Sequence, residues 1–302
     1  MRKRRSRKRR NEYEYKVLLV CARGWHNIPS VAVCWDPQQY LQYEHERERP
    51  WAELLARVVH PGPSEVVDLG CGPGITTTRL LARWPDAHIL GIDSSAEMIS
   101  HARPLAVPGR LEFRQADLRE WRPDSPVDIL LSNATLHWVP GHQSLLPQFV
   151  ACLAPGGCFA FQVPANFAEP SHTLLYELAR SDRWADRLGA VVLPSSSPPA
   201  AYLSTLIATG ARADVWETTY FHVLDGPDAV LEWVRGTALR PFVTALEAVD
   251  AGEQEAAEFE HAYAAALRAA YPRDAEGRTV FPFRRIFGVA TVTAEGTPDK
   301  RA

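Results

Sequence analysis

The chain has 302 residues, of which 46% are hydrophobic and 23% charged, a composition typical of a globular protein with a sizeable core. It has no run of 18 apolar residues, which excludes an ordinary transmembrane helix. The formal net charge is −3, but residues 1–10 contain eight Arg or Lys, so residues 11–302 carry 25 basic against 36 acidic residues. An acidic body argues against a nucleic-acid enzyme with a basic face, and we expect neither nucleic acid nor a membrane as partner.

Three interpretations of residues 1–33 stay open: a start site assigned too far upstream, a disordered solvated arm, or a tether to nucleic acid or a membrane surface. We expect residues 1–33 to lie outside the folded part, as a disordered or non-native extension. Residues 34–293 are predicted to form a single domain, and residues 294–302 a disordered tail. The five cysteines are odd in number and lack metal-ligand spacing, which favours a reduced, cytoplasmic protein without a metal site.

The first predicted element is a helical segment that begins near Trp35. Asp36 can cap a helix that has Pro37 at its first position. Residues 43–49 are dense in charge, and Pro50 is expected to interrupt or restart the helix before residues 51–58. We expect this helical pair to lie across the mouth of a ligand site.

A β-branched run at residues 66–69 then leads into a glycine-rich loop and a segment with helical spacing. Gly70, Gly72 and Gly74 permit a sharp turn and a close ligand approach, and the following helix start presents free N–H groups. The spacing is G-x-G-x-G, which differs from the G-x-G-x-x-G of dinucleotide sites, and no Gly-Lys-Ser/Thr follows. Asp68 favours a cationic ammonium or sulfonium over a pyrophosphate. These features indicate S-adenosyl-L-methionine as the cofactor.

The next segments repeat the alternation of strand and helix. Residues 88–93 are predicted to form a buried strand that ends in Asp93, 19 residues beyond Gly74 and near the spacing at which an acid binds ribose hydroxyls. Further strands are predicted at residues 111–117, 127–133 and 158–163. Five such units in a row predict a doubly wound parallel sheet. Beyond them we expect a helix at 171–188, a strand at 215–223, a helical cap at about 225–272 and a final strand at 280–292.

These motifs together resemble the trans-aconitate 2-methyltransferase family of class I, S-adenosylmethionine-dependent enzymes. The resemblance runs from Trp35 to about Val292 and rests on the segments at residues 35–40, 68–74, 91–95, 133–138 and 162–166, with later similarity at 216–220, 239–241 and 281–282. It implies a Rossmann-like, doubly wound, mostly parallel sheet with a helical N-terminal segment and a helical cap before the last strand. It also implies transfer of a methyl group to a carboxylate oxygen of trans-aconitate, which yields a monomethyl ester.

The resemblance implies roles for individual residues. Asp68 is expected near the methionine amino group, Asp93 with Ser94 at the ribose, Met98 and Asp117 at the adenine, and Asn133 at the methionyl backbone, with Gly70, Gly72 and Gly74 lining the site. The substrate is a small tricarboxylate, so cationic and hydrogen-bonding partners are needed. We expect them among His137, Trp138 and Arg240, which we place in the catalytic group, and Tyr40, Arg49, Gln162, Tyr202, Arg284 and Arg285. A carboxylate is already ionised at neutral pH, so His137 is interpreted as a hydrogen-bond or charge partner and not as an essential base.

Several alternatives remain. The same fold could act on another small acid, a phenol or a carrier-bound malonyl group, because scattered arginines leave no short signature. A nucleic-acid or protein N-methyltransferase is disfavoured, since Ala134-Thr135-Leu136 follows Asn133 where those enzymes have Pro-Pro-Tyr. A metal-dependent catechol-type enzyme is disfavoured by the lack of an evident acid cluster. A nucleic-acid-binding module that acts through the basic head would bind in a salt-sensitive way. The sequence does not indicate the oligomeric state.

Overall fold

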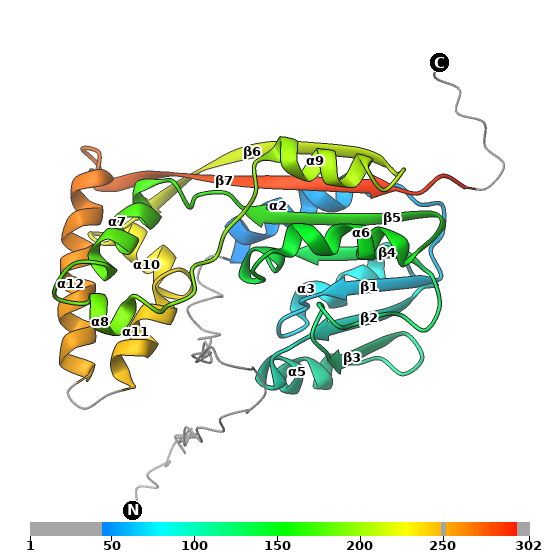
Figure 1. Cartoon of the computed structure of the whole chain (residues 1–302), viewed down its shortest axis with the longest axis horizontal. Coiled ribbons are helices and arrows are strands. Elements are labelled where there is room, and N and C mark those ends of the chain that lie inside the picture. Colours follow the sequence, from blue (N-terminus) through cyan, green and yellow to red (C-terminus); the bar gives the residue numbers. More distant parts are fainter. Residues whose placement is uncertain (1–43, 249–251, 295–302) are drawn as a thin grey trace, which may run out of the picture.

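The computed structural model describes residues 44–248 and 252–294. The helix predicted at residues 35–40, with Tyr40, lies outside this range. In the described part, seven strands form one sheet in the order β3-β2-β1-β4-β5-β7-β6 (Figure 1). The strands are β1 (Glu65–Leu69), β2 (His88–Asp93), β3 (Leu111–Gln115), β4 (Val127–Asn133), β5 (Leu153–Pro164), β6 (Arg212–Asp225) and β7 (Arg278–Thr291).

Strands β1 to β5 are parallel, and β7 pairs antiparallel with both β5 and β6. The predicted doubly wound, mostly parallel sheet is therefore confirmed. The chain order reverses at β1, which lies between β2 and β4. In sheets of this kind, ligands bind beyond the carboxyl ends of the strands at such a switch point.

Helices cover both faces of this sheet. Helices α6 (Leu146–Ala151) and α9 (Pro199–Ile207) pack on the face that carries Phe161 and Ile286, and α2 (Glu44–Ala56) packs with α4 (Leu80–Arg83) on the other. The short helices around the sheet are α3 (Ile75–Thr78), α5 (Ala96–Ala102) and the 3₁₀ turns η1 (Arg103–Leu105), η2 (Leu136–Trp138) and η3 (His142–Leu145). No described helix combines the length and apolarity needed to cross a bilayer.

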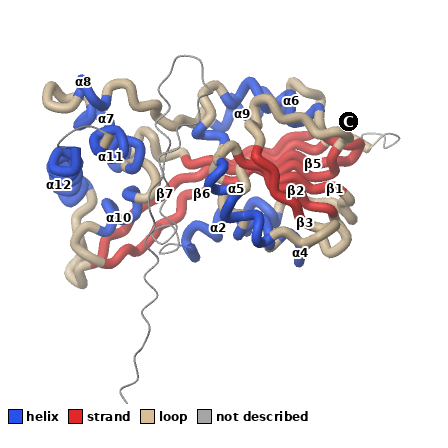
Figure 2. Tube along the Cα trace, turned by 90° about the horizontal axis from the view of Figure 1, so that it is seen from below, coloured by secondary structure: helices blue, strands red, loops and turns tan. Residues whose placement is uncertain are grey.

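A second group of helices gathers at one end of the molecule (Figure 2). This helical subdomain consists of α7 (Pro170–Ala179), α8 (Ala185–Leu188), α10 (Ala229–Arg235), α11 (Arg240–Glu247) and α12 (Gly252–Ala270). They share one apolar core, which includes Leu175, Trp233, Phe242 and Phe259. The cap predicted at about 225–272 thus omits α7 and α8, because two helix groups distant in sequence bury their apolar faces against one another.

The subdomain is carried by a two-stranded ribbon. The pairing of β7 with β5 ends at Arg285, opposite Pro164. From there to Arg278, β7 pairs only with β6. Phe281 and Phe283 of this ribbon lie in the core of the helical subdomain, whereas Phe287 lies in the core between the sheet and α2. Arg285 therefore occupies the junction between the two bodies.

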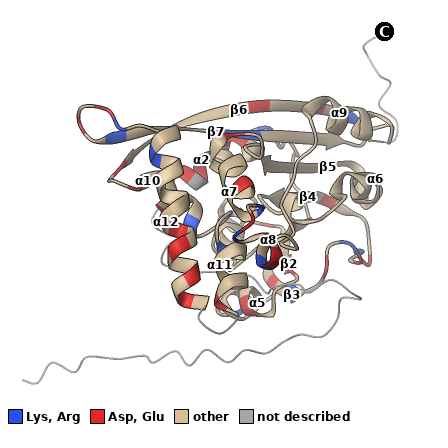
Figure 3. Cartoon of the chain, turned by 60° about the vertical axis from the view of Figure 1, so that its left-hand side comes forward, with Lys and Arg blue, Asp and Glu red and all other residues tan. Residues whose placement is uncertain are grey.

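Acidic residues are spaced along α12 (Figure 3). Glu255 and Glu258 form ion pairs with Arg187 and Arg183 of the α8 region. These side chains are 32–60% exposed, and ion pairs of that kind contribute little to stability. Other charges of α12 pair elsewhere, Glu260 with Arg235 of α10 and Arg268 with Asp228.

Helix α2 continues through Pro50, so the predicted interruption is wrong. Trp51 and Leu54, which are 3% and 0% exposed, hold the helix on the sheet, and this tertiary packing outweighs the hydrogen bond that proline cannot donate. Glu53 fixes the same helix to β6. Its carboxylate accepts hydrogen bonds from Trp216 Nε1 at 2.9 Å, from Thr218 Oγ1 at 2.6 Å and from the Tyr220 hydroxyl.

Replacement of Glu53 by Ala removes the shared acceptor of these three donors. Burial alone would raise the pKa of Glu53, but the hydrogen bonds from Thr218, Tyr220 and Trp216 outweigh burial and lower it. We expect Glu53→Ala to reduce the free energy of unfolding by about 2–4 kcal/mol, since partly buried donors lose their partner. Urea denaturation measures this change, with Glu120→Gln on the surface as control. Equal stability of the two variants would contradict the anchoring role.

Candidate active site

The loop between β1 and α3 is built on three glycines with positive φ. The φ values are 79° at Gly70, 55° at Gly72 and 83° at Gly74. A Cβ on Gly70 would lie 2.1 Å from the Thr135 side chain, and one on Gly74 would lie 2.7 Å from Phe113. A Cβ on Gly72 would meet no atom of the described residues within 4 Å. Two of these glycines thus permit close packing, while the third leaves backbone open to a ligand.

Asp68, at the end of β1, is a buried carboxylate with one unused oxygen. It is 2% exposed, and its Oδ2 accepts a hydrogen bond from Thr77 Oγ1 at 2.7 Å. Its Oδ1 has no hydrogen-bond partner among the described residues. Burial raises the pKa of Asp68 to about 6, with a further rise from the charge of Asp93. A ligand ammonium at this position would supply both the missing donor and a compensating positive charge.

Asp93, at the end of β2, connects the glycine loop to the next strand. It accepts the Gly72 N–H at 3.0 Å on one oxygen and the Ser95 N–H at 2.8 Å on the other. Burial raises the pKa of Asp93, and these two hydrogen bonds oppose the rise. Each oxygen keeps a second acceptor position, which suits ligand hydroxyls. Ser94 beside it is exposed, and its carbonyl accepts a hydrogen bond from Gln115 at 3.1 Å.

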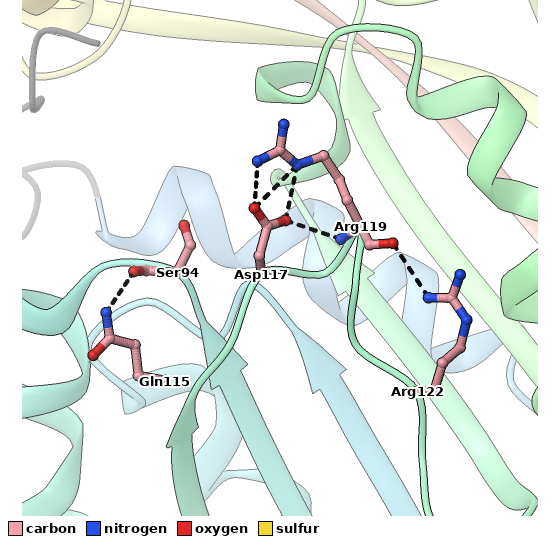
Figure 4. A network of polar contacts seen from close by, with 5 residues as sticks. All are labelled: Ser94, Gln115, Asp117, Arg119 and Arg122. Atoms are coloured by element: carbon pink, nitrogen blue, oxygen red, sulfur yellow. Dashed lines mark hydrogen bonds and ion pairs between the residues drawn. The ribbon is translucent and has the colours of Figure 1, made fainter. Parts of the chain in front are cut away.

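Asp117, the acid that follows β3, already has a partner within the chain. Asp117 is paired with the Arg119 side chain and also accepts the Arg119 N–H at 2.9 Å (Figure 4). The hydrogen bond from the Arg119 side chain lowers the pKa of Asp117. An adenine amino group at Asp117 would therefore share this carboxylate with an arginine. Met98, in the first turn of α5, is half-buried, and its N–H donates to Ser95 Oγ at 3.3 Å.

Cys71 lies within the same loop. Its side chain is 4% exposed, and its Sγ lies 3.6 Å from the Gly72 carbonyl oxygen. Burial, together with the charges of Asp68 and Asp93, raises the pKa of this thiol well above its usual range.

A hydrogen-bonded chain leads from the end of β4 across the sheet. The Gln162 side chain on β5 donates to Asn133 Oδ1 and accepts from an Arg285 terminal nitrogen on β7 at 3.2 Å. Gln162 is 1% exposed and Arg285 7%. Asn133, which the family resemblance predicts at the methionyl backbone of the cofactor, is thus linked through Gln162 to the buried guanidinium of Arg285.

His137 follows in the turn after β4, next to Trp138, whose ring centroid is 5.0 Å away. It is 6% exposed, and its Nδ1 has no hydrogen-bond partner in the described part of the chain. Burial, followed by the charge of Arg285, lowers the pKa of His137 well below its usual range. The imidazole is therefore neutral at pH 7, so it can donate a hydrogen bond without being a strong base.

Side chains from η2, β5, β6 and β7 contact the guanidinium or lie within reach of its charge, and we refer to this group as the Arg285 cluster. Its members besides Arg285 are Gln162, His137, Tyr220, His222 and Phe283. The guanidinium carbon lies 4.7 Å from the centroid of the Phe283 ring. Arg49 of α2 stacks on Tyr220 at 4.9 Å.

Sequence reasoning missed Tyr220 and His222. The signal that could have found them is the alternation of Trp216, Thr218, Tyr220 and His222 on one face of the predicted strand at 215–223. That alternation shows a shared face but not which strand lies beside it.

Two predicted substrate residues lie apart from the cluster. Arg284 points to the opposite face of β7, where its side chain donates to the Ala165 carbonyl at 2.9 Å and lies 3.5 Å from Glu217. Tyr202 is 0% exposed, and its hydroxyl lies 2.6 Å from His142 Nε2.

Arg240 is placed at the start of α11, in the helical subdomain. Burial raises the pKa of Glu260 on α12, and the charges of Arg235 and Arg240 partly oppose that rise. The charge of Arg240 thus acts on Glu260 of α12, and its role toward the substrate stays a prediction.

The fold and the loop after β1 are those of class I methyltransferases, and the comparisons with known proteins agree. A family model described as "Methyltransferase domain" matches residues 66–157. A putative methyltransferase from Bacillus halodurans superposes with a TM-score of 0.52 at 15% identity, covering 80% of this chain and 98% of its own, which shows the shared fold.

Relatives found by sequence identify a particular family within this class. A trans-aconitate 2-methyltransferase of Streptomyces avermitilis is 52% identical over 87% of this chain and 98% of its own length. A trans-aconitate 2-methyltransferase of Methylobacterium nodulans is 47% identical over 86% of this chain and 98% of its own length. The chain belongs to the trans-aconitate 2-methyltransferase family.

Asp68→Asn separates ligand binding from stability. The folded-state pKa of Asp68, about 6, exceeds the ordinary value of 3.8. The folded protein therefore binds this proton more tightly than the unfolded chain, so stability falls as the pH rises from about 4 to about 6 and stays lower above that range. At pH 8 we expect the ligand-free variant to be more stable than the wild type by up to about 3 kcal/mol, a gain that vanishes toward pH 4.

The same variant should bind S-adenosylhomocysteine at least about tenfold more weakly, because it loses a charge-assisted hydrogen bond. Urea denaturation at pH 5 and pH 8 and titration calorimetry measure the two effects. Unchanged affinity for S-adenosylhomocysteine would contradict the assignment of Asp68 to the ligand ammonium.

Proposed function

We propose that this chain transfers a methyl group from S-adenosylmethionine to a carboxylate of trans-aconitate and so forms a monomethyl ester. The observation that carries the proposal is the chain of hydrogen bonds from Asn133 through Gln162 to Arg285. It places a buried guanidinium beside the strand ends where the ligand loop lies. The family relatives bear the name of this activity.

The residues around the glycine loop fit the cofactor. The unused oxygen of Asp68 would hold the ammonium of its methionine part, and the open backbone at Gly72 leaves room for it. Asp93 would bind the ribose hydroxyls through the acceptor positions that remain. When bound, S-adenosylmethionine supplies a methyl group made electrophilic by a positively charged sulfur.

The Arg285 cluster would bind and orient the acid. Arg285 supplies positive charge, and Gln162 fixes one of its terminal nitrogens. The substrate carboxylate is ionised at pH 7, so the site has to supply alignment and exclusion of water and not a base. Neutral His137 can then donate a hydrogen bond to the acid, while the Phe283 ring shields the guanidinium from solvent.

The direct test is turnover. We expect the purified chain with S-adenosylmethionine to convert trans-aconitate into a product heavier by one methylene unit, detected by mass spectrometry. Cis-aconitate, isocitrate and a malonyl thioester serve as competing substrates. Methylation of the malonyl thioester with no turnover of trans-aconitate would contradict the proposal and favour the alternative, in which another acid is the substrate.

Two adjacent arginines provide a matched pair of variants. Arg285→Gln removes a 7% exposed cation from the cluster, whereas Arg284→Gln removes one from the opposite face of the same strand. We expect Arg285→Gln to lower kcat/KM for trans-aconitate by at least about thirtyfold, since a buried charge partner of the substrate is lost. The Arg284→Gln variant should stay within about threefold of the wild type. Steady-state kinetics with equal loss in both variants would contradict the placement of the substrate at Arg285.

A further inference from the structure

His222 is a buried histidine with an unused ring nitrogen. It lies on β6 in the two-stranded ribbon, opposite Phe281 of β7, and is 4% exposed. Its Nδ1 has no hydrogen-bond partner among the described residues. A buried polar atom without a partner costs free energy, and a phenylalanine in its place would avoid that cost.

The surroundings of His222 combine aromatic rings with the charges of two arginines. Its ring stacks on Trp233 at 4.4 Å between centroids and lies 6.2 Å from Phe283. Burial, followed by the charges of Arg285 and Arg49, lowers the pKa of His222 to about 4. The imidazole is therefore uncharged at pH 7, and its environment favours an anion as the missing partner.

Burial, followed by the charge of Arg285, lowers the pKa of His222 and of His137. The buried Nδ1 of each imidazole has no hydrogen-bond partner within residues 44–248 and 252–294. His137 follows β4, next to the ligand loop, whereas His222 lies on the ribbon toward the helical subdomain. The charge of Arg285 thus reaches one imidazole in the turn after β4 and another on the ribbon, where the Phe283 ring lies beside both Arg285 and His222.

We propose that His222 donates a hydrogen bond from Nδ1 to the third carboxylate of the substrate, the one that a trans dicarboxylate lacks, while another carboxylate is methylated, and so makes the site selective for tricarboxylates. This inference rests on the proposed function, because it assumes that the acid lies at the Arg285 cluster. His222 is then a specificity-determining contact, distinct from the groups that align the reacting carboxylate.

Equilibrium binding tests this role without turnover. The chain is saturated with S-adenosylhomocysteine and titrated by calorimetry with trans-aconitate and with fumarate, a trans dicarboxylate that lacks the third carboxylate. His222→Phe keeps an aromatic ring beside Trp233 but has no donor. His222→Asn restores a donor near the position of Nδ1. His88→Phe, on β2, controls for replacement of a strand histidine outside the cluster.

We expect His222→Phe to weaken trans-aconitate binding by about tenfold to a hundredfold, as for loss of a hydrogen bond to a charged group, and fumarate binding by less than about threefold. His222→Asn should recover most of the loss, and His88→Phe should match the wild type. Unchanged trans-aconitate binding in His222→Phe, or equal loss for both acids, overturns the proposal. A wild-type chain that neither binds nor methylates trans-aconitate overturns the proposed function as well, whereas intact wild-type activity confines the failure to His222.

Discussion

The register of β7 is the constraint on which the rest of the structure depends. This strand pairs with β5 over residues 285–291 and only with β6 over residues 278–284. It contributes Phe287 to the core against α2 and Phe281 to the core of the helical subdomain. A slip of one residue would exchange the two faces, bring Arg284 into the interior and turn Arg285 outward. The core of the helical subdomain and the core against α2 both fix the register of β7. Packing at both ends of this strand therefore sets the position of Arg285.

The three acids at the ends of β1, β2 and β3 differ in their capacity to bind a ligand. Asp68 is buried, and one of its oxygens has no partner in the described part of the chain, while Asp93 accepts from two backbone N–H groups and Asp117 is paired with Arg119. Their pKa values follow from these surroundings: burial raises those of Asp68 and Asp93, while Arg119 lowers that of Asp117. The strongest demand for a cation is therefore at Asp68. This agrees with the choice of a sulfonium cofactor over a pyrophosphate.

The parallel half of the fold could be predicted from the sequence. Buried strands in α/β proteins form short apolar runs that end in acids or glycines, and the predicted ranges 88–93 and 127–133 coincide with β2 and β4. The composition of the helical subdomain could not be predicted, because α7 joins α10–α12 through contacts distant in sequence. The same limit applies to the site. Motif spacing pointed to Asp68, Asp93 and the glycines, but the choice between Arg284 and Arg285 depends on an antiparallel pairing that no local pattern shows.

The state of Cys71 has a consequence for chemical compatibility. An electrophilic methyl donor and a cysteine in one loop would be hazardous partners if the sulfur were a thiolate, the nucleophilic form. Burial and the two neighbouring acids keep this sulfur protonated. A negative environment that suits a cationic methyl donor would thereby also keep the Cys71 sulfur from competing for the methyl group.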